Sequence, residues 1–293
     1  MILVSDTSTS YVEERTMINI GTMRARRSVR TFTEESVASK LIEKLSAYMK
    51  ELDNPFHIPI EFQILDAKEH KVSSPVLVGA QTYIVGKYQR QPNAELAFGY
   101  EFEKLMLCAV SLGLGTVWIA GTMDRKAFER AIEVKDGEVM PAITPIGYAA
   151  NKKSVREGMM RKAIKADERM DFEKLFFDRN FEHPLKEADA GRFLLPLQMV
   201  RWAPSATNKQ PWRLVVDGNR IHFYEEKTKG YDREEIGDVQ KIDLGIAMAH
   251  FEIAANETGQ KGRFVQANPK LMLPENTEYI TTFEIMLPQS HLL

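Results

Sequence analysis

Two short polar stretches carry residue types that could bind an anionic cofactor. The first lies near the N-terminus, where Arg26, Ser28 and Arg30 place two guanidinium groups and a hydroxyl within five residues. Arginine side chains bind phosphate oxygens through paired, charge-assisted hydrogen bonds, so this spacing suits a phosphate group. A solvated basic turn is the alternative interpretation of the same residues.

The second stretch runs from Trp202 to Trp212 and is rich in residues that interrupt regular structure. Its two prolines, serine, threonine and asparagine cannot sustain a helix or a central strand. A tryptophan at each end indicates an anchored loop. Prolines lower the entropy that a loop loses on ordering, which favours a loop preorganised for binding. A rigid connector between a helix and a strand is the alternative.

Composition limits the kind of protein that these stretches belong to. The chain has 293 residues, of which 44% are hydrophobic and 27% charged, as in a globular protein with ample core. A net charge of −2 gives no reason to expect nucleic-acid binding. No stretch approaches the roughly 20 apolar residues of a membrane span. Because Cys108 is the only cysteine, the chain cannot form an intrachain disulfide, which indicates the reducing cytoplasm. Residues 1–10 are expected to be a flexible extension without a signal peptide.

Apolar periodicity predicts the elements that must position the two stretches. Both polar stretches fall between predicted elements, where loops commonly carry function. Helices are predicted over residues 11–24, 33–53, 98–112, 124–132, 185–200 and 245–259. Strands are predicted over residues 60–64, 76–79, 82–85 and 279–285, with a hairpin over 213–224 around Asp217-Gly218.

Together the two stretches resemble the paired signatures of the nitroreductase family of flavoproteins. The basic stretch matches Arg-x-Ser-x-Arg, and the loop matches Pro-Ser-x-x-Asn-x-Gln-Pro-Trp at every fixed position. Those positions are filled by Pro204, Ser205, Asn208, Gln210, Pro211 and Trp212. The resemblance implies an FMN-dependent oxidoreductase. It also implies that residues 140–148 form a strand and residues 172–177 a short closing helix.

The resemblance assigns roles to particular residues. In the family, the arginine motif holds the phosphate and ribityl chain of FMN, and the proline-serine loop and a glycine turn approach the flavin ring. A backbone N–H near Gly121 is expected to bond flavin N5, and one or two basic residues before the closing helix are expected to reach the phosphate. The residues implied at the cofactor are Arg26, Ser28, Arg30, Trp118, Ile119, Ala120, Gly121, Lys165, Arg169, Pro204, Ser205, Ala206 and Asn208.

The order of the motifs is unusual for this family. Ordinary members carry the loop soon after the arginine motif, but residues 54–59 occupy that place here and lack the signature. The signature lies instead in an additional segment beyond residue 180. The helix from Gly99 to Gly113 has the same fourteen-residue spacing as the one from Gly245 to Gly259. We therefore predict an internal duplication.

The duplication implies a family homodimer fused into one chain. Ordinary members intertwine, and each FMN takes the arginine motif from one subunit and the loop from the other. Residues 11–180 are expected to form the first copy and residues 181–293 a partial second copy. The implied fold is α+β, with a central, mostly antiparallel sheet flanked by helices, in two tandem copies. Only one site would have both motifs, which implies one FMN per chain and a monomer or weak oligomer.

The chemistry implied by the resemblance is two-electron transfer at flavin N5. NADH or NADPH would give a hydride, and a nitroaromatic, a quinone or a similar small-molecule acceptor would take the electrons. Residues 86–98 and 225–240 are expected to line the acceptor pocket. No side chain is carried over as a catalyst, no metal is expected, and His250 is expected to be a satisfied core histidine. A non-catalytic flavin-binding protein and a degenerate protein of nitroreductase fold are the alternatives.

Overall fold

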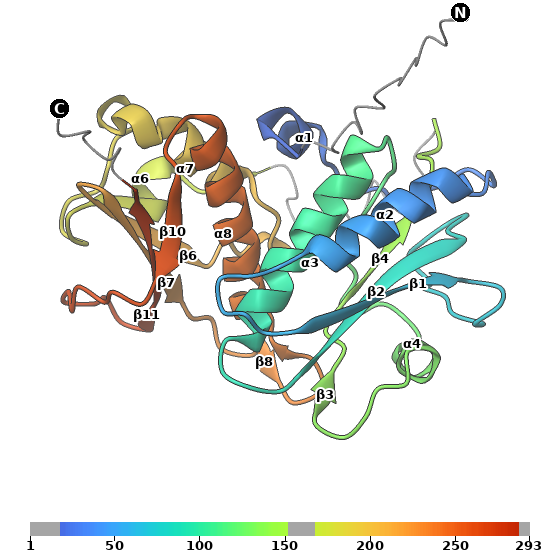
Figure 1. The fold of residues 1–293 in the computed structure, drawn as a ribbon. Helices are drawn as coiled ribbons and strands as arrows, with labels where there is room; N and C mark the ends of the chain where they lie inside the picture. The colour runs from blue at the N-terminus through green and yellow to red at the C-terminus, as the bar shows by residue number, and fades with distance from the viewer. Residues whose placement is uncertain (1–17, 152–167, 287–293) are drawn as a thin grey trace, which may run out of the picture.

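A computed structural model describes residues 18–151 and 168–286 of the chain. The first half contains a small four-stranded antiparallel sheet with the order β1-β2-β3, in which β4 also pairs with β2 (Figure 1). The elements of this half are α1 Ile20–Ala25, α2 Ser39–Glu51, β1 Ile60–Asp66, β2 Thr82–Gln89, α3 Ala94–Ser111, α4 Arg125–Ala131, β3 Glu138–Val139 and β4 Ile143–Ile146.

The second half contains a five-stranded sheet with the order β10-β11-β7-β6-β5. Its pairs are antiparallel except for β5 and β6, which run parallel. The elements of this half are α6 Phe172–Leu175, β5 Phe176–Asp178, α7 Leu194–Trp202, β6 Trp212–Asp217, β7 Arg220–Glu226, β8 Asp232–Arg233, β9 Gly237–Asp238, α8 Val239–Glu257, β10 Gly262–Val265 and β11 Thr277–Ile285. The predicted α+β class and the hairpin of β6 and β7 are confirmed.

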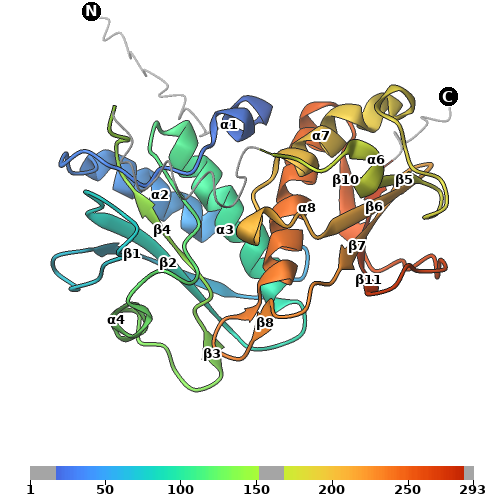
Figure 2. The ribbon, with the colours of Figure 1, turned by 180° about the vertical axis from the view of Figure 1, so that it is seen from behind.

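Helices α3 and α8 pack against each other between the two sheets (Figures 1 and 2). Two glycines allow this close approach. A Cβ added at Gly99 would lie 2.1 Å from the carbonyl oxygen of Ile242, and one at Gly245 would lie 2.2 Å from the carbonyl oxygen of Leu96. The contact is reciprocal. Ile242, which faces Gly99, lies three positions before Gly245, and Leu96, which faces Gly245, lies three positions before Gly99. The two glycines that the sequence aligned as copies therefore meet at the crossing point.

The ends of the two helices are also alike. Gly113 follows α3 with a φ of +84°, and Gly259 follows α8 with a φ of +81°. This left-handed backbone favours glycine and closes the helix by capping its last carbonyls. In both cases the backbone N–H groups after the last turn bond back to helix carbonyls. The equal spacing in the sequence therefore corresponds to two helices of matching length and termination.

One segment of the first half joins the sheet of the second half. Strand β5 lies at the end of the first copy in the sequence, yet it pairs with β6 of the second-half sheet. The large hydrophobic core is also shared, since it includes Ile84 of β2, Phe98 of α3, Trp212 of β6 and Phe251 of α8. The two halves are consequently one packed unit, as the fused-dimer interpretation requires.

Three predicted helices differ from those observed. The helix expected from residue 33 begins at Ser39, because the preceding backbone is extended: Phe32 donates to Val78 O at 2.8 Å and Thr33 to Tyr148 O at 2.9 Å. The helix expected over residues 185–200 begins at Leu194, after two 3-10 turns at Glu187–Asp189 and Gly191–Phe193. The helix expected over residues 11–24 is described only from Ile20 to Ala25.

Smaller differences concern strands. Residues 76–79 were expected to be a strand, but only an isolated bridge joins Val78 to Thr31. The closing helix expected over residues 172–177 ends at Leu175 and continues as β5. Residues 1–10 and Lys165 lie outside the described residues.

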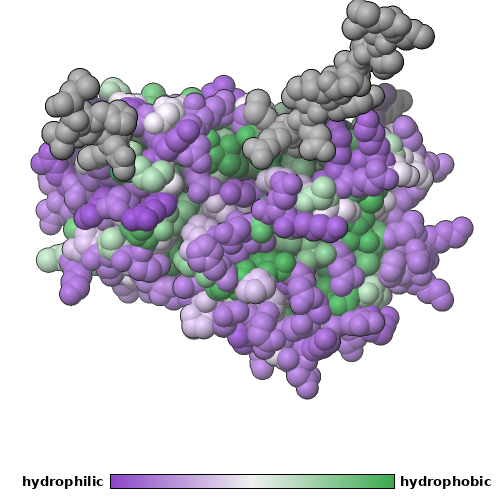
Figure 3. Space-filling view, viewed as in Figure 1, coloured by the Kyte–Doolittle hydropathy of each residue, from purple (hydrophilic) through white to green (hydrophobic). Residues whose placement is uncertain are grey.

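The surface agrees with the composition. The face in Figure 3 is mostly hydrophilic, with small apolar patches between polar residues. Within the described ranges, no helix is both long enough and apolar enough to cross a membrane.

Candidate active site

A cavity of about 260 Å³ lies between the two halves, and both sequence signatures contribute to its wall. The arginine motif supplies Ser28 and Arg30, and the segment after α3 supplies residues 117, 118 and 120. The loop of the second copy supplies residues 204–207. The lining residues are Ser28, Arg30, Val117, Trp118, Ala120, Pro141, Ala142, Pro204, Ser205, Ala206, Thr207, Val239, Ile242, Asp243 and Ile246.

The arginine motif is held by backbone pairing on both sides. Val29 donates to Thr116 O at 2.9 Å, and Val78 donates to Arg30 O at 2.9 Å. Gly115 allows the first contact, because a Cβ there would lie 2.9 Å from the Val29 side chain. The motif is thereby clamped between two segments of its own copy. Arg30 is only 8% exposed although it borders the cavity, so its charge is presented from a largely dehydrated position.

Several hydrogen bonds hold the backbone of the proline-serine loop. It begins where α7 ends, and its Thr207, Asn208 and Gln210 have φ values of +48°, +59° and +50°. Such left-handed backbone is uncommon outside glycine and persists only where surrounding bonds hold it. Here Gln210 N–H donates to Ser205 Oγ at 2.9 Å, and Met170 N–H donates to Gln210 Oε1 at 3.1 Å.

Asp243 on α8 anchors this loop at the cavity wall. Both carboxyl oxygens lie 3.0 Å from the backbone N–H of Ala206, and the residue is 3% exposed. Burial raises the pKa of Asp243 well above its ordinary value, and the negative charges of Asp238 and Glu225 add to the effect. These surroundings disfavour the charged form of a carboxyl group at the cavity wall, and the hydrogen bond from Ala206 acts in the opposite direction. The sequence showed Asp243 only as part of an Asp-x-Gly helix start.

The side chain of Arg26 lies against Glu103 and does not line the cavity as Arg30 does. Its Nε lies 3.6 Å from Glu103 Oε1 in the protein interior, and it is not among the residues that line the cavity. Its buried Nη1 has no hydrogen-bond partner among the described residues. Its predicted contact with the phosphate stays a prediction.

The segment after α3 presents its side chains to different surroundings. Trp118 and Ala120 line the cavity, and Trp118 Nε1 donates to Glu103 Oε2 at 2.7 Å. Ile119 points into the core, and its backbone pairs with Ile143 at 3.0 and 2.8 Å. Gly121 is exposed and does not line the cavity. The predicted bond from its N–H to the flavin remains untested.

The other predicted contacts lie behind the loop. Asn208 Nδ2 donates to Glu168 O at 2.9 Å, and Arg169 donates from Nη2 to Trp202 O at 3.2 Å. Arg169 also lies over the ring of Trp202, with 5.9 Å between its Cζ and the ring centroid. Neither Asn208 nor Arg169 lines the cavity, so both support the loop from outside.

Histidines and acids form no metal centre in the described part of the chain, where no group of three or more His, Cys, Asp or Glu residues could hold an ion. His250 is fully buried, with both ring nitrogens in hydrogen bonds to Met199 O and Glu103 Oε1. It is a satisfied core histidine, as predicted.

The residues at the cavity fit a flavin mononucleotide. Apolar groups dominate its wall, which suits the faces of a planar ring system, while Arg30 and Ser28 offer a cation and a hydroxyl to a phosphate. The buried Nη1 of Arg26 also lacks a partner nearby. The volume of about 260 Å³ is close to the lower end of the roughly 300–1,000 Å³ typical of small-molecule pockets. It therefore suits the ring system better than the whole nucleotide.

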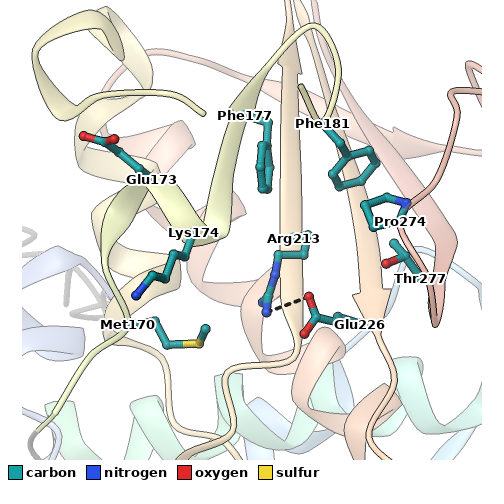
Figure 4. A pocket seen from close by; sticks show the side chains of 9 residues that line it. All are labelled: Met170, Glu173, Lys174, Phe177, Phe181, Arg213, Glu226, Pro274 and Thr277. Carbon is teal, nitrogen blue, oxygen red and sulfur yellow. Dashed lines mark ion pairs between the residues drawn. The ribbon is translucent and has the colours of Figure 1, made fainter. Parts of the chain in front are cut away.

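A second hollow of about 380 Å³ lies on the second half, and none of the signature residues lines it (Figure 4). Phe177, Phe181 and Pro274 border one side, and Lys174 approaches from the other. Arg213 lies between them and is paired with Glu226 at 2.9 Å. Arg213 also donates to Gln210 O and Trp212 O, so its main role is to support the strand that follows the loop.

Comparison with known proteins agrees with this geometry. The family described as "Putative TM nitroreductase" matches residues 19–255, a range that includes both signatures and every residue lining the cavity. The chain therefore belongs to the nitroreductase family and is an oxidoreductase of that type.

One solved structure shows the same fold, and two others are similar over about half of the chain. One described as a "putative nitroreductase" from Thermotoga maritima has 18% sequence identity and a TM-score of 0.61, over 96% of this chain and 99% of its own. An FMN-dependent nitroreductase from Clostridium difficile has 22% identity and a TM-score of 0.40, over 46% of this chain and 90% of its own. A "putative NADH oxidase" from Clostridium acetobutylicum has 24% identity and a TM-score of 0.39, over 45% of this chain and 89% of its own. No curated protein matches the chain.

Proposed function

We propose that this chain is an FMN-dependent NAD(P)H oxidoreductase that binds one FMN in the cavity between its two copies. The observation that carries the proposal is the convergence of the two signatures. Ser28 and Arg30 of the first copy and residues 204–207 of the second line one cavity, although the chain separates them widely. Neither signature could bind a flavin alone in this fold, because each supplies only part of the wall.

The residues at the cavity have distinct roles in this proposal. Arg30 and Ser28 bind the phosphate through charge-assisted and neutral hydrogen bonds. Trp118, Ala120 and Pro204 form apolar contacts with the flavin ring and exclude water from it. Bound FMN supplies two-electron chemistry, in which NADH or NADPH is the reductant and a nitroaromatic, quinone or similar small molecule is the acceptor. Asp243 keeps the loop in place through its hydrogen bonds to the backbone N–H of Ala206.

The reciprocal site is filled by side chains, which supports one flavin per chain. The two copies can be matched by setting Gly99 of α3 equal to Gly245 of α8. In this match Tyr100 takes the place of Ile246 and Phe264 takes the place of Trp118, and both Ile246 and Trp118 line the cavity. Tyr100 and Phe264 pack edge to face, with 6.3 Å between ring centroids. The Tyr100 hydroxyl is held by Glu252 and by Lys104 Nζ at 2.5 Å. By this correspondence, the two rings take the places of two residues that line the cavity, and we infer that they leave no room for a second flavin.

The fused arrangement also leads us to propose a monomer or weak oligomer. The contacts that an ordinary homodimer makes between subunits are made here within one chain, through α3, α8 and β5. We keep residues 11–180 and 181–293 as the proposed limits of the two copies. Light scattering should give the mass of one chain, whereas an obligate dimer would contradict this proposal.

Reconstitution with FMN tests the site. Purified protein is soaked with FMN, desalted, and its bound flavin released and quantified by absorbance. We expect one FMN per chain. Arg30→Ala should lose most of this flavin, whereas Arg192→Ala should keep it, because Arg192 is exposed and bonds only the hairpin turn of β6 and β7. Full flavin retention by Arg30→Ala would contradict the assigned phosphate site.

A second measurement separates turnover from binding alone. Under anaerobic conditions, NADH or NADPH should bleach the flavin absorbance, and a quinone or nitroaromatic should restore it. Stoichiometric flavin that neither nucleotide bleaches would instead support the non-catalytic flavin-binding protein.

A further inference from the structure

We propose that His250 of the second copy is a positioning residue for the flavin cavity, acting through Glu103 to hold the Trp118 indole in the cavity wall. The inference rests on the proposed function, because the cavity is taken to bind FMN. Neither His250 nor Glu103 lines the cavity, so neither is a catalytic residue.

Glu103 is the centre of a buried charge cluster. It lies on α3, is fully buried, and meets donors from three segments. Its Oε2 accepts from Trp118 Nε1 at 2.7 Å, and its Oε1 lies 2.9 Å from His250 Nε2 and 3.6 Å from Arg26 Nε. One carboxylate thus connects the cavity wall, the arginine motif and the helix of the other copy.

The surroundings of Glu103 favour its ionised form. Burial would raise the pKa of Glu103, but the hydrogen bond from His250 and the positive charge of Arg26 outweigh burial and bring this pKa below its ordinary value. The carboxylate of Glu103 can then only accept hydrogen bonds. The other ring nitrogen of His250, Nδ1, faces Met199 O at 3.0 Å, which holds the imidazole in place. Glu103 and Arg26 are thus a buried ion pair that His250 supports from the other copy.

Such a pair is poorly explained by stability alone. Removing two charges from water is costly, and apolar residues of similar volume often stabilise a core equally well. Breaking the pair by removing one partner, however, leaves a buried charge uncompensated. The cluster is therefore better suited to holding its members in one geometry than to adding stability.

Trp118 depends on this cluster for its orientation. Its ring packs edge-on against Phe102 at 4.8 Å and Phe98 at 6.2 Å, contacts that are apolar and tolerate rotation of the ring. Glu103 is the acceptor of its indole N–H. If His250 no longer holds Oε1 of Glu103, the carboxylate can turn from its present position, and Trp118 then loses the acceptor that orients it.

Two readouts test the proposal. His250→Leu removes the donor, while His250→Gln keeps an N–H near the position of Nε2. Flavin affinity is measured by FMN titration. The emission of Trp118 is measured in flavin-free protein as the difference between each variant and the same variant carrying Trp118→Phe. We expect His250→Leu to weaken FMN binding by about tenfold or more and to shift the Trp118 emission, and His250→Gln to restore both in large part.

His222→Leu is the matched control. His222 is also a buried histidine, with Nδ1 2.8 Å from Thr282 Oγ1, but it lies in the second-half sheet, does not line the cavity and, among the described residues, makes no hydrogen bond to the cluster. It should leave the FMN affinity and the Trp118 emission unchanged. Equal effects of the two leucine variants would mean general destabilisation and would overturn the proposal.

The remaining outcomes also decide the matter. Unchanged FMN affinity and unchanged Trp118 emission in His250→Leu would overturn the proposal. If that variant does not fold, Glu103→Gln replaces it: the neutral amide cannot accept from both donors, so the same two shifts are expected, and their absence counts against the proposal. If the parent chain binds no FMN, the proposed function fails, but the emission of Trp118 still tests the positioning.

Discussion

Adding one methyl group at the helix crossing tests how the two copies are joined. In Gly245→Ala, the new Cβ would lie 2.2 Å from Leu96 O, 2.8 Å from Tyr100 N and 3.0 Å from Gly99 Cα. These are backbone atoms and cannot rotate away, so α3 and α8 must separate by about an ångström to reach ordinary contact. Overpacking of this kind costs about 3 kcal/mol at the upper end of its usual range. The higher helix propensity of alanine offsets about 1 kcal/mol of this loss in stability.

The expected net loss is therefore about 2 kcal/mol in the free energy of unfolding. Urea unfolding followed by far-ultraviolet circular dichroism measures it. Gly121→Ala is the matched control, because a Cβ there meets nothing within 4 Å and its backbone does not require glycine. The control should be neutral or slightly stabilising. Stabilisation of Gly245→Ala by about 1 kcal/mol, the propensity gain alone, would refute the close crossing of the two helices.

Two further predictions concern buried titratable groups. Burial raises the pKa of Glu101 to about 7, so the folded state keeps a proton that the unfolded state releases near pH 4. Stability should fall by up to about 3 kcal/mol as pH rises from 4 to 7, and Glu101→Gln should flatten this dependence in urea unfolding; an unchanged slope would contradict it. Burial also raises the pKa of the Cys108 thiol to about 12. A disulfide reagent at neutral pH should therefore modify the unfolded but not the native chain, and rapid native labelling would contradict this burial.

Much of the fold was predictable because its signals are local. The β6–β7 hairpin is encoded by alternating apolar residues around Asp217-Gly218, and α3 by a long apolar run ended by Gly113. The helix start at residue 33 was wrong because the acidic capping pattern there competes with backbone pairing to Val78 and Tyr148. Those partners are distant in the chain, so no local pattern reports them.

The candidate site was predictable to a similar extent. The two signatures named Ser28, Arg30, Pro204 and Ser205, and the structure brings these residues to one cavity. The sequence did not show that the side chain of Arg26 points to Glu103. Its orientation depends on this buried acid, which is distant from Arg26 in the chain.

The sequence by itself determined the family and the two signatures, because these are properties of residue type and spacing. Only the tertiary structure decided which signature residues reach the cavity, and that Tyr100 and Phe264 pack edge to face. It also placed Asp243 and the Glu103–His250 pair beside the loop and the cavity wall. The physical reason is that burial and charge pairing depend on contacts between distant segments, and these contacts exist only after α3 and α8 have packed.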